Sequence, residues 1–405
     1  MTSVRTPSRP TAAGASPAAV ESSSLSLGPP SSSVSLGAAA PAIASSGDSS
    51  VHDAIKRAAQ WLLDRQHEDG YWVGELEGDT ILESEYILLL AFLGEERSEV
   101  AQAAGRYMLR KQMPAGGWNM YPGGPIEISG SVKAYLALKI LGYDPNDERL
   151  VRAKNAILAA GGADKVNTFT RFYLALLGQI GYDRCPTVPP QVMFLPTWFP
   201  INRTKFSAWS RTMVAPLALM SALKPLTQIA PEKGCSELFI KPPAEWTWPL
   251  RPGQSDPGFF SWRSLFLKID ATLKFLERFN LVPLQSLGVR TAEKWMLDRF
   301  ELSDGLGAIF PPMVWSIIAL RALGYRNDDP ALVDCRKKLD DLILRDDSAQ
   351  GGPEVRLQPC KSPVWDTSLS LLALSDAGAA FDHPAVETAE KWLLAKQTTR
   401  PGDWS

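Results

Sequence analysis

The chain repeats one pattern, a short amphipathic segment that ends in Gln and leads into a Gly-Xaa-Trp turn. We call the complete copies Gln–Trp units; their Gln and Trp residues are Gln66 and Trp72, Gln112 and Trp118, and Gln397 and Trp404. A decayed copy runs from Thr291 to Arg299, with Phe300 in place of Gln and Gly305-Leu306-Gly307 in place of the turn. Repeats of this length indicate stacked supersecondary units rather than one irregular globule.

Each unit is paired with a second segment that is apolar on most sides. Segments 80–93, 131–141 and 312–323 stop at a glycine, the residue favoured just after a helix ends. Ser362-Pro363 marks a further helix start, because Ser caps a helix and Pro suits its first turn. Since charged amphipathic helices alternate with nearly all-apolar ones, we expect two concentric layers with the apolar helices inside. The sequence therefore predicts an all-α fold, an α/α toroid or double-layer helical barrel, and no strand-like alternation competes with it.

Two segments depart from this repeat. Residues 1–50 hold 15 Ser, 10 Ala and 6 Pro without an aromatic residue, so they bury too little apolar surface to become ordered. Residues 183–262 carry 13 of the 32 prolines and five of the 13 tryptophans, which excludes long helices. Within them we expect one helix near 206–223, interrupted or kinked near Pro216. The predicted organisation is a disordered tail (1–50), the first repeat helices (51–182), a Pro/Trp-rich loop insertion (183–262) and further repeats (263–405).

Composition excludes several classes of protein. The balance of 42 basic and 44 acidic residues gives no reason to expect a nucleic-acid partner. Four Cys and three His are too scattered for a zinc site or a disulfide scaffold, so we predict neither a metal nor a cofactor. The longest apolar run, 86–93, is less than half of what a bilayer crossing requires.

Apolar residues gather again at 259–267 and 281–284, beside the loop-rich insertion. One interpretation is that they fill the core. The other is a surface patch that dips into a membrane without crossing it, as interfacial helices do. The sequence leaves both open.

Four further blocks of sequence follow one another in a fixed order. They are Val188-Pro189-Pro190 with Phe194-Leu195, Phe206-Ser207-Ala208-Trp209-Ser210-Arg211, Gly305-Leu306-Gly307-Ala308-Ile309-Phe310-Pro311-Pro312, and Ser362-Pro363-Val364-Trp365-Asp366-Thr367. With the Gln–Trp units, which resemble the repeated QW motifs of the triterpene cyclases, these blocks resemble the squalene–hopene cyclases most closely, from about Val51 to Ser405. The resemblance implies a membrane-dipping α/α-barrel enzyme that takes squalene from the lipid phase into a buried apolar cavity. There a carboxylic acid protonates the terminal double bond, and aromatic faces stabilise the carbocations.

The resemblance assigns cavity roles to individual positions. The residues that it places at the substrate cavity are Trp209, Trp365, Phe310, Glu85 and Asp366. Glu85 resembles an acidic residue that family members hold near the cavity through hydrogen bonds; alternatively it reaches solvent or a basic partner. Asp366 lies in a first helical turn, where an acid also simply favours the helix dipole. Trp365 is equally compatible with core filling, and Phe310 stands where some relatives carry Gln.

Other positions take channel or structural roles by the same resemblance. Phe206 and Val214 resemble parts of the constriction between the membrane channel and the cavity. Lys133 occupies a place where some relatives have Glu, which argues against a polar relay there. The Gln–Trp residues (Gln66, Trp72, Gln112, Trp118, Gln397 and Trp404) are interpreted as structural, with each Gln amide bonded to backbone at a neighbouring helix end.

The family's proton donor belongs to an Asp-Xaa-Asp-Asp motif, and none occurs in these 405 residues. In relatives the motif lies shortly beyond a Pro-Gly-Asp-Trp segment, which here is Pro401-Gly402-Asp403-Trp404. We therefore expect the N-terminal portion of a squalene–hopene cyclase, truncated in the middle of a repeat, with unknown catalytic residues and no activity alone.

Other functions stay open at this stage. The same scaffold serves a cyclase for oxidosqualene or a shorter polyprene, and a binding protein or pseudoenzyme with the toroid fold is the non-enzyme alternative. The expected partners are squalene or a similar polyprene and the cytoplasmic side of a membrane, contacted without spanning it, with a possible homodimer in the full-length form.

Overall fold

The computed structural model describes residues 49–199, 202–246, 261–279, 281–300, 303–380 and 382–399. The predicted tail up to residue 48, part of the insertion after residue 246, and Trp404 lie outside the described residues. Contacts divide the chain into residues 1–54 and residues 55–405. The fold below is that of the second unit.

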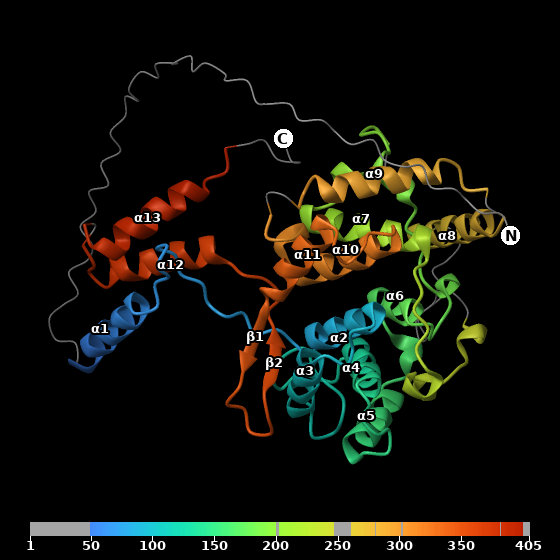
Figure 1. The fold of residues 1–405 in the computed structure, drawn as a ribbon, viewed down its shortest axis with the longest axis horizontal. Coiled ribbons are helices and arrows are strands. Elements are labelled where there is room, and N and C mark those ends of the chain that lie inside the picture. Colours follow the sequence, from blue (N-terminus) through green and yellow to red (C-terminus); the bar gives the residue numbers. More distant parts are fainter. Residues whose placement is uncertain are drawn as a thin grey trace. The chain divides into compact units, whose positions relative to one another are not determined.

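The described chain is predominantly helical, which confirms the predicted class (Figure 1). The α-helices are α1 (Ser49–Leu63), α2 (Ile81–Leu93), α3 (Glu99–Arg110), α4 (Ile128–Ile140), α5 (Glu148–Ala159), α6 (Thr168–Leu176), α7 (Ala208–Leu223), α8 (Trp262–Arg278), α9 (Gln285–Leu297), α10 (Phe310–Ala322), α11 (Pro330–Asp340), α12 (Pro363–Asp376) and α13 (Pro384–Lys396). Short 3₁₀ turns connect several of them, most densely between α6 and α8.

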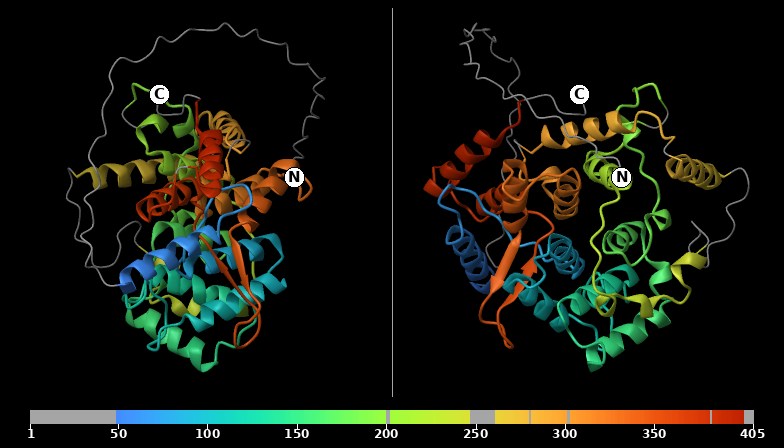
Figure 2. Two further views of the ribbon diagram at one scale, coloured as in Figure 1. Left: turned by 90° about the vertical axis from the view of Figure 1, so that its left-hand side faces the viewer. Right: turned by 45° about the vertical axis from the view of Figure 1, so that its right-hand side comes forward.

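The described chain also contains a two-stranded antiparallel hairpin, which the sequence did not predict. It consists of β1 (Ile343–Asp346) and β2 (Glu354–Leu357), with Ile343 opposite Leu357. Strands of four residues are too short to show a recognisable alternation in sequence, and a hairpin alone is marginally stable. Tertiary contacts stabilise this one: β2 packs against α2 and α3 (Figure 2), and Arg110 of α3 donates two hydrogen bonds, of 2.9 and 2.8 Å, to the Glu354 carboxylate.

Helix packing follows the predicted two layers. Helices α4, α2, α10 and α7 pack side by side in that order, and behind them α5, α3, α11 and α9 pack against each in turn; α6 contacts α2 and α4. Helix α4 is buried from Ser129 to Ile140, whereas α5 buries only Leu150, Ala153 and Ile157. The helix spacing of those three residues gives α5 one apolar stripe and leaves its opposite side to solvent. The first set is therefore the inner layer and the second the outer layer.

The helix expected near 206–223 is α7, and it belongs to this inner layer. It begins after Ser207, whose hydroxyl accepts the Ser210 N–H at 3.1 Å, and continues without interruption through Pro216. Because α7 packs between α9 and α10, this part of the predicted insertion is built into the core.

Buried apolar side chains form two separate clusters. The large cluster is built from α2–α7, α9–α11 and the hairpin. The small cluster consists of Trp72, Leu374 and Ala389 (of α13), with partly buried residues of α1, α12 and the turn after α12 around it. Helices α12 and α13 lie side by side (Figure 1). Three fully buried side chains contribute little hydrophobic stabilisation, so the small cluster depends on its other contacts.

Two Gln–Trp units make equivalent contacts with other helix pairs. The Gln66 side-chain amide donates to the Ala385 carbonyl in the first turn of α13, and the Gln112 amide donates to the Arg149 carbonyl in the first turn of α5; both distances are 2.8 Å. Gly116, at φ +85°, lies against the backbone of Arg152, where a Cβ atom would come within 2.4 Å of a carbonyl oxygen. A side chain is therefore excluded from this turn.

The tryptophans of the same units contact inner helices. The Trp72 N–H donates to Thr367 Oγ1 of α12, and the Trp118 N–H donates to Ser131 Oγ of α4, each at 2.9 Å. Each indole N–H also donates to a carbonyl of its own preceding helix, at 2.7 and 2.8 Å. A unit thus connects its own helix to both the inner and the outer helix of another pair. Gln397 is exposed at the C-terminal cap of α13.

Candidate functional site

A buried polar cluster lies between three helices of the large cluster. Glu85 of α2 is 5% exposed, Lys133 of α4 is 2% exposed, and Tyr173 of α6 is fully buried. The Lys133 ammonium donates to Glu85 Oε1, and the Tyr173 hydroxyl donates to Glu85 Oε2 at 3.1 Å. A buried carboxylate is tolerated when it is paired and hydrogen-bonded, and both of its oxygens are satisfied here.

Aromatic rings cover one side of this cluster. The Trp315 ring of α10 lies 4.3 Å from the Tyr173 ring, centroid to centroid, and Lys133 Nζ lies 5.8 Å from the Tyr173 centroid. Burial and the nearby Glu85 charge raise the pKa of Tyr173 well above its usual range. The phenol is therefore protonated at neutral pH and remains a hydrogen-bond donor.

Glu85 is conspicuous in the sequence, but its surroundings are not. The family resemblance made Lys133 an argument against a polar relay, whereas Lys133 is the basic partner of Glu85. The available signal was a lysine in the middle of an otherwise apolar segment. Tyr173 and Trp315 gave no such signal, because aromatic residues on apolar helices are ordinary core residues.

Two predicted cavity tryptophans have substantially exposed side chains. Trp209 near the start of α7 is 50% exposed, and Trp365 near the start of α12 is 69% exposed. By contrast, the Phe310 ring is fully buried in the large cluster. Phe206 and Val214, assigned to a constriction, are partly buried and pack against the same cluster. The cavity roles of Trp209, Trp365 and Phe310 and the constriction roles of Phe206 and Val214 stay proposals. The described structure does not gather all five side chains at one site.

Asp366 makes contacts that the sequence analysis did not anticipate. One carboxylate oxygen accepts the Gly74 N–H at 2.9 Å, and both oxygens lie 3.0 Å from Ser362 Oγ. The side chain thus bonds the start of α12 to the segment that leads into α2.

A second acidic residue on α2, Glu83, was also missed. It is 1% exposed, and its Oε1 accepts the Leu357 N–H of β2 at 2.7 Å, while Oε2 has no hydrogen-bond partner among the described residues. Burial raises the pKa of Glu83 to about 8. The neutral acid is therefore its main form at pH 7.

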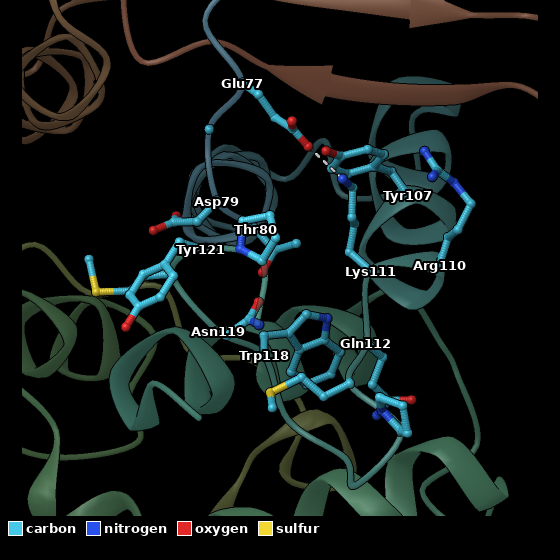
Figure 3. A pocket seen from close by; sticks show the side chains of 15 residues that line it. Glu77, Asp79, Thr80, Tyr107, Arg110, Lys111, Gln112, Trp118, Asn119 and Tyr121 are labelled. Atoms are coloured by element: carbon cyan, nitrogen blue, oxygen red, sulfur yellow. Dashed lines mark hydrogen bonds and ion pairs between the residues drawn. The ribbon is translucent and has the colours of Figure 1, made fainter. Parts of the chain in front are cut away.

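A pocket of about 460 Å³ lies beside the second Gln–Trp unit (Figure 3). Its walls carry Glu77, Asp79, Arg110 and Lys111, and the Lys111 ammonium pairs with Glu77 at 2.5 Å. Tyr107, Trp118 and Tyr121 also line the pocket, but a hydrocarbon would desolvate its charged side chains without offering them a hydrogen bond. We therefore do not place the substrate cavity there.

Comparisons with known proteins identify the family. A model of the squalene–hopene cyclase N-terminal domain matches residues 55–348, and a model of the C-terminal domain of the same family matches residues 361–405. The squalene–hopene cyclase of Zymomonas mobilis is 36% identical over 358 residues, which cover 88% of this chain and 53% of that protein.

Two other relatives give the same result. A dammaradiene synthase of Dryopteris crassirhizoma is 36% identical over 349 residues, covering 86% of this chain and 49% of the relative. The squalene–hopene cyclase of Alicyclobacillus acidocaldarius is 32% identical over 351 residues, covering 87% and 54%. This chain spans about half the length of the curated relatives that it matches. It belongs to the squalene–hopene cyclase family.

Proposed function

We propose that this chain supplies part of the substrate cavity of a terpene cyclase that folds squalene, or a similar polyprene, into fused rings. The observation that carries the proposal is the family match, which covers residues 55–348 and 361–405. A hydrocarbon substrate offers no heteroatom to bind, so recognition depends on shape and apolar burial. Exposed aromatic faces such as those of Trp209 and Trp365 suit both the hydrocarbon and its cationic intermediates.

The Glu85 cluster has a supporting role in this proposal. Its carboxylate is paired with Lys133 and hydrogen-bonded by Tyr173, so the charge is balanced inside an apolar wall. The proton that starts cyclisation must come from another acid, and no Asp-Xaa-Asp-Asp motif occurs in these 405 residues. We therefore expect substrate contact without turnover.

The test is to incubate the purified 405-residue chain with squalene in detergent and to analyse products by gas chromatography and mass spectrometry. We expect bound squalene and no cyclised product. Turnover above a protein-free blank would show that a different acid in this chain starts the reaction. Absence of squalene binding would instead favour a pseudoenzyme that has lost its ligand. If the chain did turn squalene over, parallel incubations with oxidosqualene and with a shorter polyprene would show which of the three substrates the cyclase prefers.

We also propose that helix α8 and the start of α9 contact a membrane surface. Exposed apolar side chains gather there: Leu265, Phe266, Ile269, Phe275 and Phe279 of α8 and its end, followed by Leu281, Leu284 and Leu287. Leu265, Phe266, Leu281 and Leu284 lie in the segments at 259–267 and 281–284. Because these four side chains are exposed, the core-filling interpretation is wrong for them. Asp270 of α8 accepts the Thr187 N–H at 2.7 Å and so fixes the helix to the loop before α7.

A membrane role is consistent with the helix lengths. No helix among the described residues is long and apolar enough to cross a bilayer. An exposed apolar patch on a fixed amphipathic helix instead suits partial insertion at the level of the lipid headgroups. The cytoplasmic side and the homodimer expected for the full-length form stay predictions.

Replacing Phe275 and Phe279 together by Glu is expected to lower partition onto neutral phosphatidylcholine vesicles at least tenfold. Each buried phenylalanine contributes about 1.5–3 kcal/mol of apolar transfer free energy, which the charged side chain removes. Co-sedimentation with vesicles measures the effect. The matched control is Met120→Glu with Tyr121→Glu, an equally charged change at two exposed apolar residues outside the patch. Equal binding by both double variants would exclude α8 as the contact surface.

A further inference from the structure

The large and small clusters are connected by two segments of chain that run past each other. The first, residues 73–80, leads from Trp72 into α2; the second, residues 356–363, leads from β2 into α12. Among the described residues, no helix of the large cluster packs extensively against α1, α12 or α13. The crossing segments therefore carry most of the connection between the clusters.

Two contacts join the crossing segments to each other, and a third joins the first segment to Asp366 of α12. Arg356 donates two hydrogen bonds to the Glu75 carboxylate, at 2.6 and 2.8 Å. The Leu76 N–H donates to Gln358 Oε1 at 3.1 Å, and the Gly74 N–H donates to Asp366 Oδ2 at 2.9 Å. One of these contacts is a bidentate ion pair, and such pairs fix direction as well as distance.

The second crossing segment is also fixed to the large cluster, but only up to residue 359. The Leu357 N–H donates to Glu83, the Gln358 N–H donates to the Leu342 carbonyl, and the Pro359 carbonyl accepts the Phe310 N–H; these distances lie between 2.7 and 3.0 Å. Beyond residue 359, α12 returns to the first segment through Asp366, whose carboxylate accepts the Gly74 N–H, and to its start through Thr367, whose Oγ1 accepts the Trp72 N–H.

A cleft of about 350 Å³ opens beside this connection. Asp304, Met313 and Lys338 line it on the side of the large cluster, and Tyr71, Trp392 and Lys396 line it on the side of the small cluster. Its walls thus belong to two bodies that share few direct contacts, so its width depends on how the crossing segments hold the bodies apart.

We propose that residues 73–76 and 356–366 form a clasp that sets the position of the small cluster, with Asp366 as its positioning residue. Asp366 fixes the first turn of α12 and with it the adjacent Trp365, which presents its exposed ring from the small cluster. The idea that Trp365 is positioned at a substrate rests on the proposed function. The clasp itself is independent of that function. Asp366 acts through the backbone of Gly74 and not by contact with substrate.

The first test is hydrogen–deuterium exchange of the full chain. Asp366→Ala removes the acceptor of the Gly74 N–H, and we expect exchange in peptides covering 73–79 to accelerate at least tenfold. Asp366→Asn retains a side-chain oxygen at the same place, and we expect it to restore exchange to within about twofold of the parent. No acceleration would overturn the clasp. Equal acceleration in α2 and α4 would also overturn it, since the residue would then stabilise the whole unit.

The second test measures the cleft by cross-linking Lys338 to Lys396 with a short amine-reactive reagent and quantifying the product by mass spectrometry. Arg356→Met removes the ion pair with Glu75, and we expect the cross-link yield to fall at least threefold as the clusters separate. The matched control is Arg326→Met, which removes an exposed pair with Asp328. Equal yields from the two variants would contradict the proposal. Neither test uses squalene turnover, so the clasp and the proposed function succeed or fail separately.

Discussion

Replacing Lys133 by Met is expected to lower the free energy of unfolding by about 3–5 kcal/mol, because it leaves the Glu85 carboxylate buried without its cationic partner. The two side chains are 2% and 5% exposed, so water does not replace the lost ammonium. The Tyr173 hydroxyl alone remains as a donor to Glu85. Urea unfolding followed by circular dichroism at pH 7 measures the change.

The control for this experiment is Lys111→Met. Lys111 also pairs with a glutamate, Glu77, at 2.5 Å, but the two side chains are 36% and 61% exposed. An exposed pair contributes about 0–1 kcal/mol, so this variant is expected to stay close to the parent. The double variant Lys133→Met with Glu85→Leu removes both buried charges and is expected to recover most of the lost stability. If Lys133→Met cost no more than Lys111→Met, the Glu85 cluster would not be a buried ion pair in solution.

Stability is expected to fall as the pH rises from about 4.5 to about 8, because folding holds a proton on Glu83 that the unfolded chain releases. The folded pKa lies above the unfolded value, so the native state binds more protons throughout this interval and each pH unit costs up to about 1.4 kcal/mol. The contribution is complete below the unfolded pKa and is lost as the pH passes the folded pKa. Urea midpoints measured from pH 5 to pH 9 show the slope.

Glu83→Gln is expected to flatten this dependence. Gln retains an oxygen that accepts the Leu357 N–H and has no proton to release in this range. Glu77→Gln serves as the control, since that side chain is exposed and its hydrogen bond with Lys111 lowers the pKa of its carboxyl. A parent profile as flat as that of Glu83→Gln would mean that Glu83 is ionised in the folded state.

Helix ends illustrate what local sequence predicts well. The expected segment 80–93 is α2, and its stop at Gly94 is a residue at φ +79°, which glycine adopts without steric cost. The start at Ser362-Pro363 is also that of α12, but the expected cap is wrong: the Ser362 hydroxyl accepts no backbone N–H of the first turn and donates to the Asp366 carboxylate instead. These features depend on residues a few positions apart, so the order of amino acids suffices to find them. The β hairpin shows the limit, because its four-residue strands depend on contacts with α2 and α3.

For the candidate site, too, local sequence predicted some features and not others. An acid on an apolar helix made Glu85 conspicuous, and the expected need for a partner followed from the cost of a buried charge. Which partner it has was not accessible, because Lys133 lies 48 residues away along the chain. Asp366 was assigned to a cavity, yet its carboxylate bonds to Gly74, 292 residues away. No local pattern encodes such pairings.

The sequence by itself determined the helical class, the Gln–Trp repeats and the family, because hydrophobic periodicity, turn glycines and ordered motifs are properties of neighbouring residues. Only the tertiary structure decided the partners: Lys133 and Tyr173 for Glu85, β2 for Glu83, and the first crossing segment for Asp366. Those pairings arise when the layers pack, since burial brings distant polar groups together and removes the water that would otherwise satisfy each of them alone.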